Sequence, residues 1–134
     1  MDRGEALVLW RLVRGQPRGG TAAERLQAFY GPQALHYDRF RERLLHGRLD
    51  LMKRLAPPVG ADVIELGAGT GRNLEFLGER LTNLGSVELV DLCPALLEQA
   101  RRRTSGLPNV RVVEADAVSY RPARPVDLVY FSYA

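Results

Sequence analysis

Three glycines at alternate positions, Gly67, Gly69 and Gly71, most constrain what this chain of 134 residues can fold into. They follow a short apolar run at 62–66 and precede a segment at 72–84 whose leucines recur every three or four residues. Glycine lets the backbone turn tightly and lets a ligand approach the amino end of a helix, where unpaired N–H groups attract a carboxylate or a phosphate. The pattern predicts a strand, a glycine-rich turn and a helix, with a binding site at the turn.

The spacing of these glycines departs from two common nucleotide-binding fingerprints. A dinucleotide fingerprint has its third glycine at position 72, where this chain has Arg72. A phosphate-binding P-loop needs a lysine followed by serine or threonine, and the turn contains no lysine. The glycine spacing alone therefore does not identify the ligand, and residues at the ends of the neighbouring strands are needed to do so.

Beyond residue 85 the sequence alternates between strand and helix patterns. Strands are expected at 86–92, 110–114 and 126–131, and a helix at 95–103 after Pro94, which suits a first helical turn. This alternation favours an α/β fold with a parallel sheet and right-handed crossovers. By analogy with doubly wound folds we expect the strand order 3-2-1-4, in which strand four is an open apolar edge that can pair with another chain.

The first 30 residues indicate helices rather than strands. A short helix is expected over 2–14, followed by a flexible, glycine-rich break at 15–20. Thr21 and Glu24 have the spacing of a capping box, so a second helix is expected to run from there to about Tyr30.

One long helix is expected over residues 37–55. Seven apolar side chains recur there every three or four positions, until a proline pair at 57–58 ends the pattern. Gly47 lies inside this segment and costs about 1 kcal/mol of helix propensity relative to alanine.

Positive charge is concentrated in the first part of the chain. Residues 1–54 carry 11 basic and 6 acidic side chains, whereas residues 55–134 carry 8 basic and 10 acidic ones. Such a surface suits the phosphates of a nucleic acid or of an anionic lipid surface, and a merely solvated arginine-rich face is an equal alternative.

The early apolar run at 6–10 is far shorter than the roughly 20 residues of a membrane span, and Asp2 and Glu5 are atypical of a signal peptide.

The single cysteine and the two histidines indicate no metal or disulfide chemistry. Cys93 excludes an internal disulfide, so we expect a cytoplasmic protein; at a helix start its thiol has either a lowered pKa or, more commonly, a small packing role. His36 and His46 have no partner at metal spacing, so no metal site is expected. The arginines at 101–103 are expected to complement a helix carboxyl end.

Two aspartates lie at the expected carboxyl ends of strands, where open parallel sheets bind ligands. Asp91 ends the second strand about 20 residues past the glycines, a place from which a carboxylate accepts hydrogen bonds from ribose hydroxyls. Asp116 follows the third strand. Either residue alone is more often an ordinary loop or cap residue, but together with the glycine turn they favour a nucleoside site.

The chain resembles class I S-adenosylmethionine-dependent methyltransferases in four motifs that follow one another in the family's order: ELGAGTGRN at 65–73, VDLCPALLEQAR at 90–101, EADA at 114–117 and VDLVYFSY at 126–133. A closer similarity, over about residues 27–134, is to the methyltransferase part of betaine lipid synthase, which methylates the amine of diacylglycerylhomoserine. It is carried by FYGPQALHYDRFRERLLHGR ahead of the sheet and by VDLCP and YFSYA within it.

The resemblance implies a Rossmann-like class I methyltransferase fold with S-adenosylmethionine as cofactor. It divides the chain into an N-terminal segment and linker at 1–20, helices covering the cofactor mouth at 21–58, and a cofactor-binding half domain at 59–134. Glu65 is implied to hold the methionine amino end and Asp91 the ribose, with Asp116 at the adenine amino group. The positions implied to contact the cofactor are Glu65, Gly67, Ala68, Gly69, Gly71, Asn73, Asp91, Leu92, Asp116, Ala117, Phe131 and Ser132.

The implied reaction is an in-line displacement in which a neutral amine attacks the methyl group on a sulfonium. Tyr37 and Arg41 are four residues apart, hence on one helix face. We expect Tyr37 to meet the amine or the sulfonium and Arg41 to meet an anionic group, with core packing as the alternative for Tyr37. The expected acceptor is a lipid amine at an anionic membrane surface, which places the protein at the inner face of the membrane.

Other functions stay open at this point. The acceptor is alternatively another small molecule or a nucleic acid, although no nucleic acid partner is expected, or the chain is a nucleoside-binding fragment without catalysis. Family members continue past strand four, whereas this sequence stops at Tyr133 and Ala134. We therefore expect a cofactor-binding half with weak or no activity alone, self-association through strand four, and a separate partner enzyme that transfers the homoserine unit.

Overall fold

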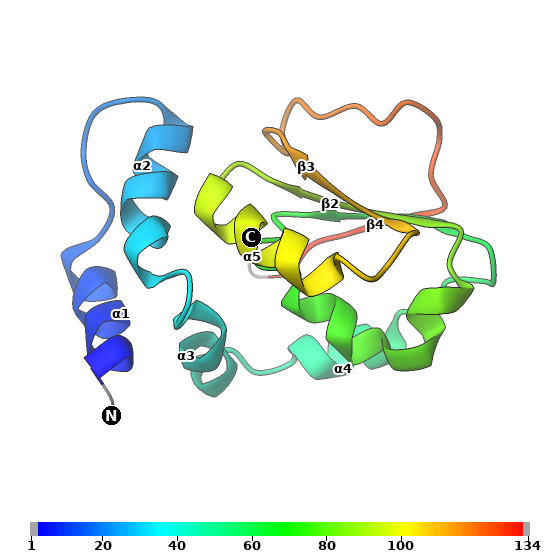
Figure 1. Ribbon diagram of the computed structural model, residues 1–134, viewed down its shortest axis with the longest axis horizontal. Coiled ribbons are helices and arrows are strands. Elements are labelled where there is room, and N and C mark those ends of the chain that lie inside the picture. The colour runs from blue at the N-terminus through cyan, green and yellow to red at the C-terminus, as the bar shows by residue number, and fades with distance from the viewer. Residues whose placement is uncertain (1–2, 133–134) are drawn as a thin grey trace.

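Four strands form one parallel sheet in a computed structural model that describes residues 3–132 (Figure 1). Their order is β3-β2-β1-β4, and every neighbouring pair is parallel. The expected α/β class and strand order are confirmed. The strands are β1 (Asp62–Leu66), β2 (Ser86–Asp91), β3 (Val110–Glu114) and β4 (Leu128–Tyr130).

The helices form two groups. The first two stand side by side away from the sheet, with α1 outermost, and the others lie below them or against the sheet (Figure 1). In chain order they are α1 (Arg3–Arg14), α2 (Ala22–Tyr30), the short 3-10 helix η1 (Gly31–Gln33), α3 (Tyr37–Leu44), α4 (Arg48–Arg54), η2 (Arg72–Asn83) and α5 (Pro94–Thr104). No helix of the described residues is long and apolar enough to cross a membrane.

The expected capping box is present at the start of α2. The Thr21 hydroxyl accepts a hydrogen bond from the Glu24 N–H, and the Glu24 carboxylate accepts one from the Thr21 N–H at 2.7 Å. These bonds satisfy two N–H groups that a helix start otherwise leaves unpaired, which is why the break at 15–20 ends where it does.

The prediction of a single helix over residues 37–55 is wrong, because the chain turns at Gly47 and forms two helices. This residue has φ of +89°, in the left-handed region, and separates α3 from α4. The turn lets the two helices bury apolar residues in different places. Tyr37 packs with the helices beside α5, whereas Met52, which is fully buried, packs against β1 and η2.

The helix expected over 72–84 is present but is not one α-helix. The structure has 3-10 geometry over Arg72–Asn83, interrupted at Gly78, whose φ and ψ of 55° and −132° are not helical. The expected leucines still face the core, because a 3-10 helix brings every third residue onto one side. Those leucines are Leu74, Leu77, Leu81 and Leu84.

Strand four is shorter than the expected 126–131 and pairs only with β1 among the described strands. Val129 on this edge is half exposed, and Phe131 just beyond it is exposed. An unpaired edge of this kind can accept another strand, so self-association through it stays a prediction. Tyr133 and Ala134 lie outside the described residues.

Candidate functional site

A cavity of about 440 Å³ opens at the carboxyl ends of the strands, between the sheet and the N-terminal helices. This volume is within the roughly 300–1,000 Å³ typical of small-molecule sites. The position is the one where doubly wound sheets bind ligands, because the strand order reverses here: β2 and β3 lie on one side of β1 and β4 lies on the other. The cavity is lined by Leu26, Tyr30, Tyr37, Arg41, Leu66, Gly67, Gly69, Asp91, Leu92, Leu96, Ala115, Asp116, Ala117, Val118 and Phe131.

The glycine turn forms the floor of this cavity and leaves no room for larger residues at its end. Gly71 has φ of +71°, and a Cβ placed on it would lie 2.9 Å from Cδ1 of Leu89 in the core. The Gly71 N–H donates to the Ala68 carbonyl at 3.0 Å, and the Ala68 N–H donates to the Val90 carbonyl at 3.0 Å. The turn is thus held against β2, with its open side toward the cavity.

Gly71→Ala is expected to destabilise the protein by about 2–4 kcal/mol, since it adds both left-handed strain and a core clash. Thermal or urea denaturation measures this change. Gly15→Ala is the matched control, because Gly15 has φ of +77° and nothing lies within 4 Å of the position that its Cβ would take, so only the strain of about 1 kcal/mol is expected there. Equal losses in the two variants would contradict the clash.

Asp91, the last residue of β2, presents a carboxylate whose position is held by the backbone. Its Oδ2 accepts a hydrogen bond from the Gly69 N–H at 2.8 Å, and its Oδ1 accepts one from the Cys93 N–H at 2.9 Å. Each oxygen keeps a further lone pair, and the side chain lines the cavity. The arrangement joins the glycine turn to an acceptor pair that two neighbouring hydroxyls can donate to.

Asp116 lies across the cavity from the glycine turn, in the loop after β3. Its Oδ1 accepts a hydrogen bond from the Val118 N–H at 2.9 Å and so shapes its own turn. The side chain lines the cavity beside Ala117. A polar oxygen next to apolar side chains suits the edge of a heterocyclic base.

Glu65 is buried beneath the glycine turn, not in the cavity wall. It is 1% exposed and accepts hydrogen bonds from Nδ2 of Asn73 at 2.6 Å and from the Tyr130 hydroxyl at 3.0 Å. Burial raises the pKa of Glu65 to about 7, against the hydrogen bonds that lower it. Arg48, at the start of α4, donates from Nε to Oδ1 of Asn73 at 2.9 Å, so a helix far away in sequence holds this group.

Aromatic side chains from the N-terminal helices line the opposite wall. The Arg41 guanidinium lies 4.8 Å from the centroid of the Tyr37 ring, so the two residues share a face as expected. Tyr30 packs edge-on against Tyr37, with 5.0 Å between ring centroids. Burial raises the pKa of the Tyr37 hydroxyl above its ordinary value, which keeps the phenol neutral. The wall thus combines neutral aromatic rings with one guanidinium.

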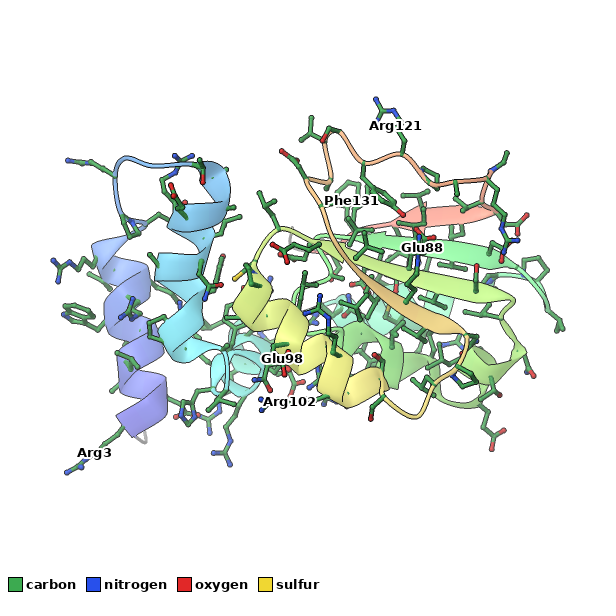
Figure 2. The ribbon with its side chains drawn as sticks, turned by 45° about the horizontal axis from the view of Figure 1, so that its top comes forward. Arg3, Glu88, Glu98, Arg102, Arg121 and Phe131 are labelled. Atoms are coloured by element: carbon green, nitrogen blue, oxygen red, sulfur yellow. The ribbon has the colours of Figure 1, made fainter. Side chains whose placement is uncertain are left out.

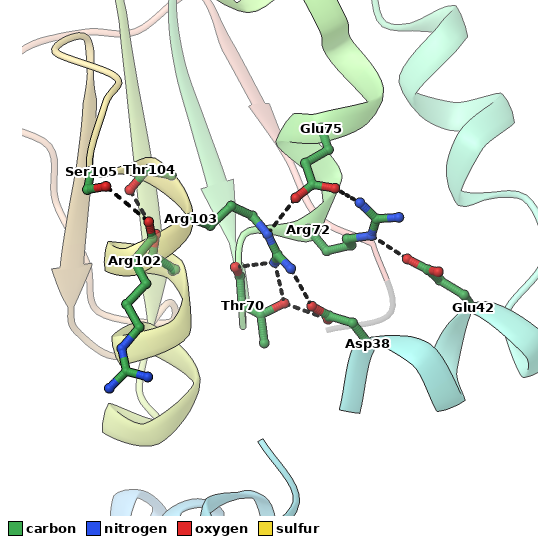
Figure 3. Close-up of polar contacts among 10 residues, drawn as sticks. Asp38, Glu42, Thr70, Arg72, Glu75, Arg102, Arg103, Thr104 and Ser105 are labelled. Atoms are coloured by element: carbon green, nitrogen blue, oxygen red, sulfur yellow. Dashed lines mark hydrogen bonds and ion pairs between the residues drawn. The ribbon is translucent and has the colours of Figure 1, made fainter. Parts of the chain in front are cut away.

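A chain of polar contacts fastens α3 to the glycine turn and to α5 (Figure 3). Arg103 donates from Nη1 to the Thr70 carbonyl at 2.6 Å and pairs through Nη2 with Asp38 at 2.8 Å. The Thr70 hydroxyl donates to Asp38 at 2.6 Å. Arg72, at the start of η2, pairs with Glu42 of α3. The arginines at 101–103 lie in the last turn of α5, as expected, but the side chain of Arg103 makes its hydrogen bonds to Thr70 and Asp38.

Arg103→Met is expected to loosen α3 while leaving the sheet intact, because it leaves one half-buried carboxylate of Asp38 without its guanidinium partner. Hydrogen exchange of the α3 amides should speed up by roughly one order of magnitude, with the β1 and β2 amides unchanged. Arg102→Met is the matched control, since Arg102 lies on the outer side of α5 and pairs only weakly with Glu98 at 3.3 Å (Figure 2). Equal effects of both changes would argue against the link.

The cavity brings together most of the residues singled out in the sequence. Five of them lie outside its lining: Glu65, Ala68, Gly71, Asn73 and Ser132. The Ser132 hydroxyl instead accepts a hydrogen bond from Nδ2 of Asn73 at 3.2 Å. Sequence reasoning missed apolar lining residues from α2, α5, the end of β1 and the loop after β3, although the helical spacing of those on α2 and α5 was visible. The missed lining residues are Leu26, Tyr30, Leu66, Leu96, Ala115 and Val118.

The described residues contain neither a cysteine with a lowered pKa nor a cluster of metal ligands. Cys93 is buried beside α2, and burial raises the pKa of its thiol, so the lowered pKa considered for a helix-start cysteine is wrong. Over residues 3–132, no group of three or more histidine, cysteine, aspartate or glutamate side chains has the arrangement needed to hold a metal ion.

Comparison with known proteins matches this chain to one family. A family model described as a methyltransferase domain matches residues 63–134. Trans-aconitate 2-methyltransferase of Methylobacterium nodulans is 34% identical over 97 residues, which are 72% of this chain and 36% of that protein. The corresponding enzyme of Enterobacter sp. (strain 638) is 37% identical over 60% of this chain and 31% of its own length.

Among solved structures, a similar one is a methyltransferase from Thiobacillus denitrificans in complex with S-adenosylhomocysteine. It has a TM-score of 0.53 and 29% identity, over 66% of this chain and 37% of that one. The chain thus spans about a third of the length of the relatives it matches.

Proposed function

Because this chain belongs to the class I S-adenosylmethionine-dependent methyltransferase family, we propose that it binds S-adenosylmethionine in the cavity beside the glycine turn and methylates an acceptor that carries an anionic group. The observation that carries the proposal is the fixed carboxylate of Asp91. It is bonded to the Gly69 and Cys93 N–H groups and faces the cavity, where the two hydroxyls of a ribose can donate to it.

The residues present fit the parts of this cofactor. Asp91 suits the ribose, the apolar Leu92 and Ala117 suit the faces of adenine, and Asp116 suits its amino group. The open side of the glycine turn admits a chain that carries a carboxylate. Glu65 would meet the methionine ammonium from beneath the turn, which requires that its side chain be ionised when the cofactor is bound.

The cofactor supplies a methyl group on a positively charged sulfur. The protein's part is to align the acceptor with that methyl and to keep water out, which by itself lowers the barrier substantially. The rings of Tyr37 and Tyr30 offer faces that stabilise positive charge, and Phe131 covers the cavity near the end of β4. The neutral phenol of Tyr37 can accept a hydrogen bond from an amine or donate one to a carboxylate.

Arg41 is the main support for an acidic acceptor. Its guanidinium lies in the cavity wall beside Tyr37, where a carboxylate can bind it in a two-pronged geometry. The amine of a lipid head group resembling diacylglycerylhomoserine, which carries both an amine and a carboxylate, is the first candidate, and a separate enzyme would attach its homoserine unit. A small carboxylic acid is the second candidate, favoured by Arg41 and by the relatives named trans-aconitate 2-methyltransferase.

Methyl transfer from radiolabelled S-adenosylmethionine separates these acceptors. The protein is incubated with a lipid extract containing homoserine lipid or with a mixture of small tricarboxylic acids. Base removes the acyl chains of the lipid but does not break an N–CH3 bond, so label that stays on the released head group indicates N-methylation. Label released as volatile methanol by base indicates a methyl ester. Arg41→Met should lower transfer to either acceptor about tenfold or more and leave S-adenosylhomocysteine binding unchanged.

Calorimetry with S-adenosylhomocysteine tests the cofactor part alone. A folded protein that does not bind it would overturn the proposal. Tight binding without transfer to lipid, acid or RNA would support a nucleoside-binding fragment instead, and transfer to RNA alone would replace the acceptor.

A further inference from the structure

The outer side of α1 exposes apolar side chains that form a stripe. Leu9 is 41% exposed, Trp10 52% and Val13 83%. On a helix these three positions face away from Val8, which is fully buried against the rest of the protein. Single exposed apolar residues are ordinary, but several of them on one helix face indicate a surface that contacts a membrane or another molecule.

Arginines flank this stripe, and no exposed carboxylate of α1 opposes them. Arg3 projects from the first turn of the helix (Figure 2), and Arg14 lies in the last turn with its guanidinium 5.0 Å from the Trp10 ring centroid. Glu5, the acidic residue of α1, is 4% exposed and pairs with Arg43 of α3 at 3.0 Å. The outer face of α1, made of Leu9, Trp10, Val13, Arg3 and Arg14, is therefore apolar and cationic.

A groove of about 320 Å³ at the end of α1 adds hydrogen-bond donors to this face. It is lined by Trp10, Arg11, Arg14, Phe29 and residues 15–17. Arg11 donates from Nη1 to the Ala28 carbonyl at 3.0 Å, while its Nε is buried and has no acceptor among the described residues. A buried N–H of this kind favours an anionic oxygen as partner, and the Arg14 guanidinium beside it adds positive charge.

We propose that the outer face of α1 lies on an anionic lipid bilayer, with Trp10 and Val13 at the boundary between head groups and acyl chains and the arginines on lipid phosphates. A helix with an apolar side edged by arginine and tryptophan is the type that lies in this boundary. The charge of this region favours an anionic bilayer over a neutral one, because residues 3–30 hold five arginines and two glutamates and positive side chains near a membrane are attracted to anionic lipids.

This inference rests on the lipid-acceptor form of the proposed function. It is tested separately from cofactor binding, so either one can fail without the other. None of the residues of the outer face of α1 lines the cofactor cavity. Vesicle binding and S-adenosylhomocysteine binding are therefore measured on the same protein as independent quantities, and loss of one does not imply loss of the other.

Trp10 is the only tryptophan of the chain, so its fluorescence reports on this face alone. Vesicles of phosphatidylcholine mixed with phosphatidylglycerol should shift its emission to the blue and sediment the protein, whereas pure phosphatidylcholine should do neither. Val13→Asp should weaken vesicle binding about tenfold or more, and Arg14→Gln about fivefold. Val59→Asp is the matched control, because Val59 is equally exposed at 84% but lies before β1, and it should bind like the unchanged protein.

Four results would overturn the proposal. One is an emission from Trp10 that does not change with anionic vesicles. Another is an equal loss of binding in Val13→Asp and Val59→Asp. The third is a blue-shifted Trp10 without vesicles in a protein whose mass in analytical ultracentrifugation rises with concentration, which would assign the face to a second copy. Saturation of the same shift by soluble glycerol phosphate would likewise reassign the groove to a small anion.

Discussion

Asp91→Ala is expected to weaken S-adenosylhomocysteine binding by about 100-fold or more. Two charge-assisted hydrogen bonds from ribose hydroxyls are lost, each contributing roughly 1.5–3 kcal/mol. The Gly69 and Cys93 N–H groups also lose their acceptor, so the turn that carries the cofactor relaxes. Isothermal titration calorimetry measures the affinity, and a thermal melt checks that the variant is folded.

Asp116→Ala is the matched comparison for this experiment. Asp116 lines the same cavity with the same functional group, but its carboxylate bonds only to its own turn, through the Val118 N–H. Because solvent competes for its oxygens, we expect a loss of less than about tenfold. A larger loss at Asp116 than at Asp91 would show that the ribose does not lie at the end of β2.

Glu65→Gln is expected to stabilise the protein at pH 8 and yet weaken cofactor binding. The pKa of Glu65 rises from an ordinary 4.5 to about 7 in the fold, so folding favours its neutral form. The stability contributed by the neutral carboxyl is complete below about pH 4.5 and is lost as the pH rises through 7. Glutamine cannot ionise, so the variant avoids that loss, which is roughly 2–3 kcal/mol at pH 8.

Urea denaturation at pH 5 and pH 8 measures this effect, with the gain expected at pH 8 and largely absent at pH 5. In the same variant, S-adenosylhomocysteine affinity at pH 8 should fall by about tenfold or more, because the ligand's ammonium loses its carboxylate partner. A variant that is less stable at pH 8 would contradict burial as the cause of the raised pKa. Unchanged affinity would remove Glu65 from the cofactor site.

The two expected effects at Glu65 have one physical cause. A carboxylate buried beside Asn73 and Tyr130 is costly to ionise in the empty fold, and a bound ammonium offsets that cost. Cofactor binding below pH 7 is therefore expected to release a proton. Arg48 moderates the same cost from α4, because its positive charge lowers the pKa of Glu65.

Local sequence patterns predicted the part of the site that depends on neighbouring residues. The turn at 67–71 and the aspartate at the end of β2 follow from a run of a few residues each, because backbone conformation and strand ends are set locally. Gly47 and Gly78 show the limit of this reasoning. The recurrence of apolar residues predicted a continuous helix through each of these glycines. The chain breaks at Gly47 because α3 and α4 pack in different places, and at Gly78 the backbone angles are not helical although the leucines on both sides pack in one core.

The sequence by itself determined the alternation of strands and helices, the strand order by analogy, and the position of the binding turn. Only the tertiary structure decided that Arg103 fastens α3 to Thr70, that Arg48 holds Asn73 over Glu65, and that Glu65 lies beneath the cavity. The contacts of Arg103 and Arg48 join residues 25 or more positions apart, and no periodic pattern records them. These contacts depend on how the helices pack on the sheet. Burial and partners distant in sequence determine the position and the ionisation of each side chain, whereas local conformation does not.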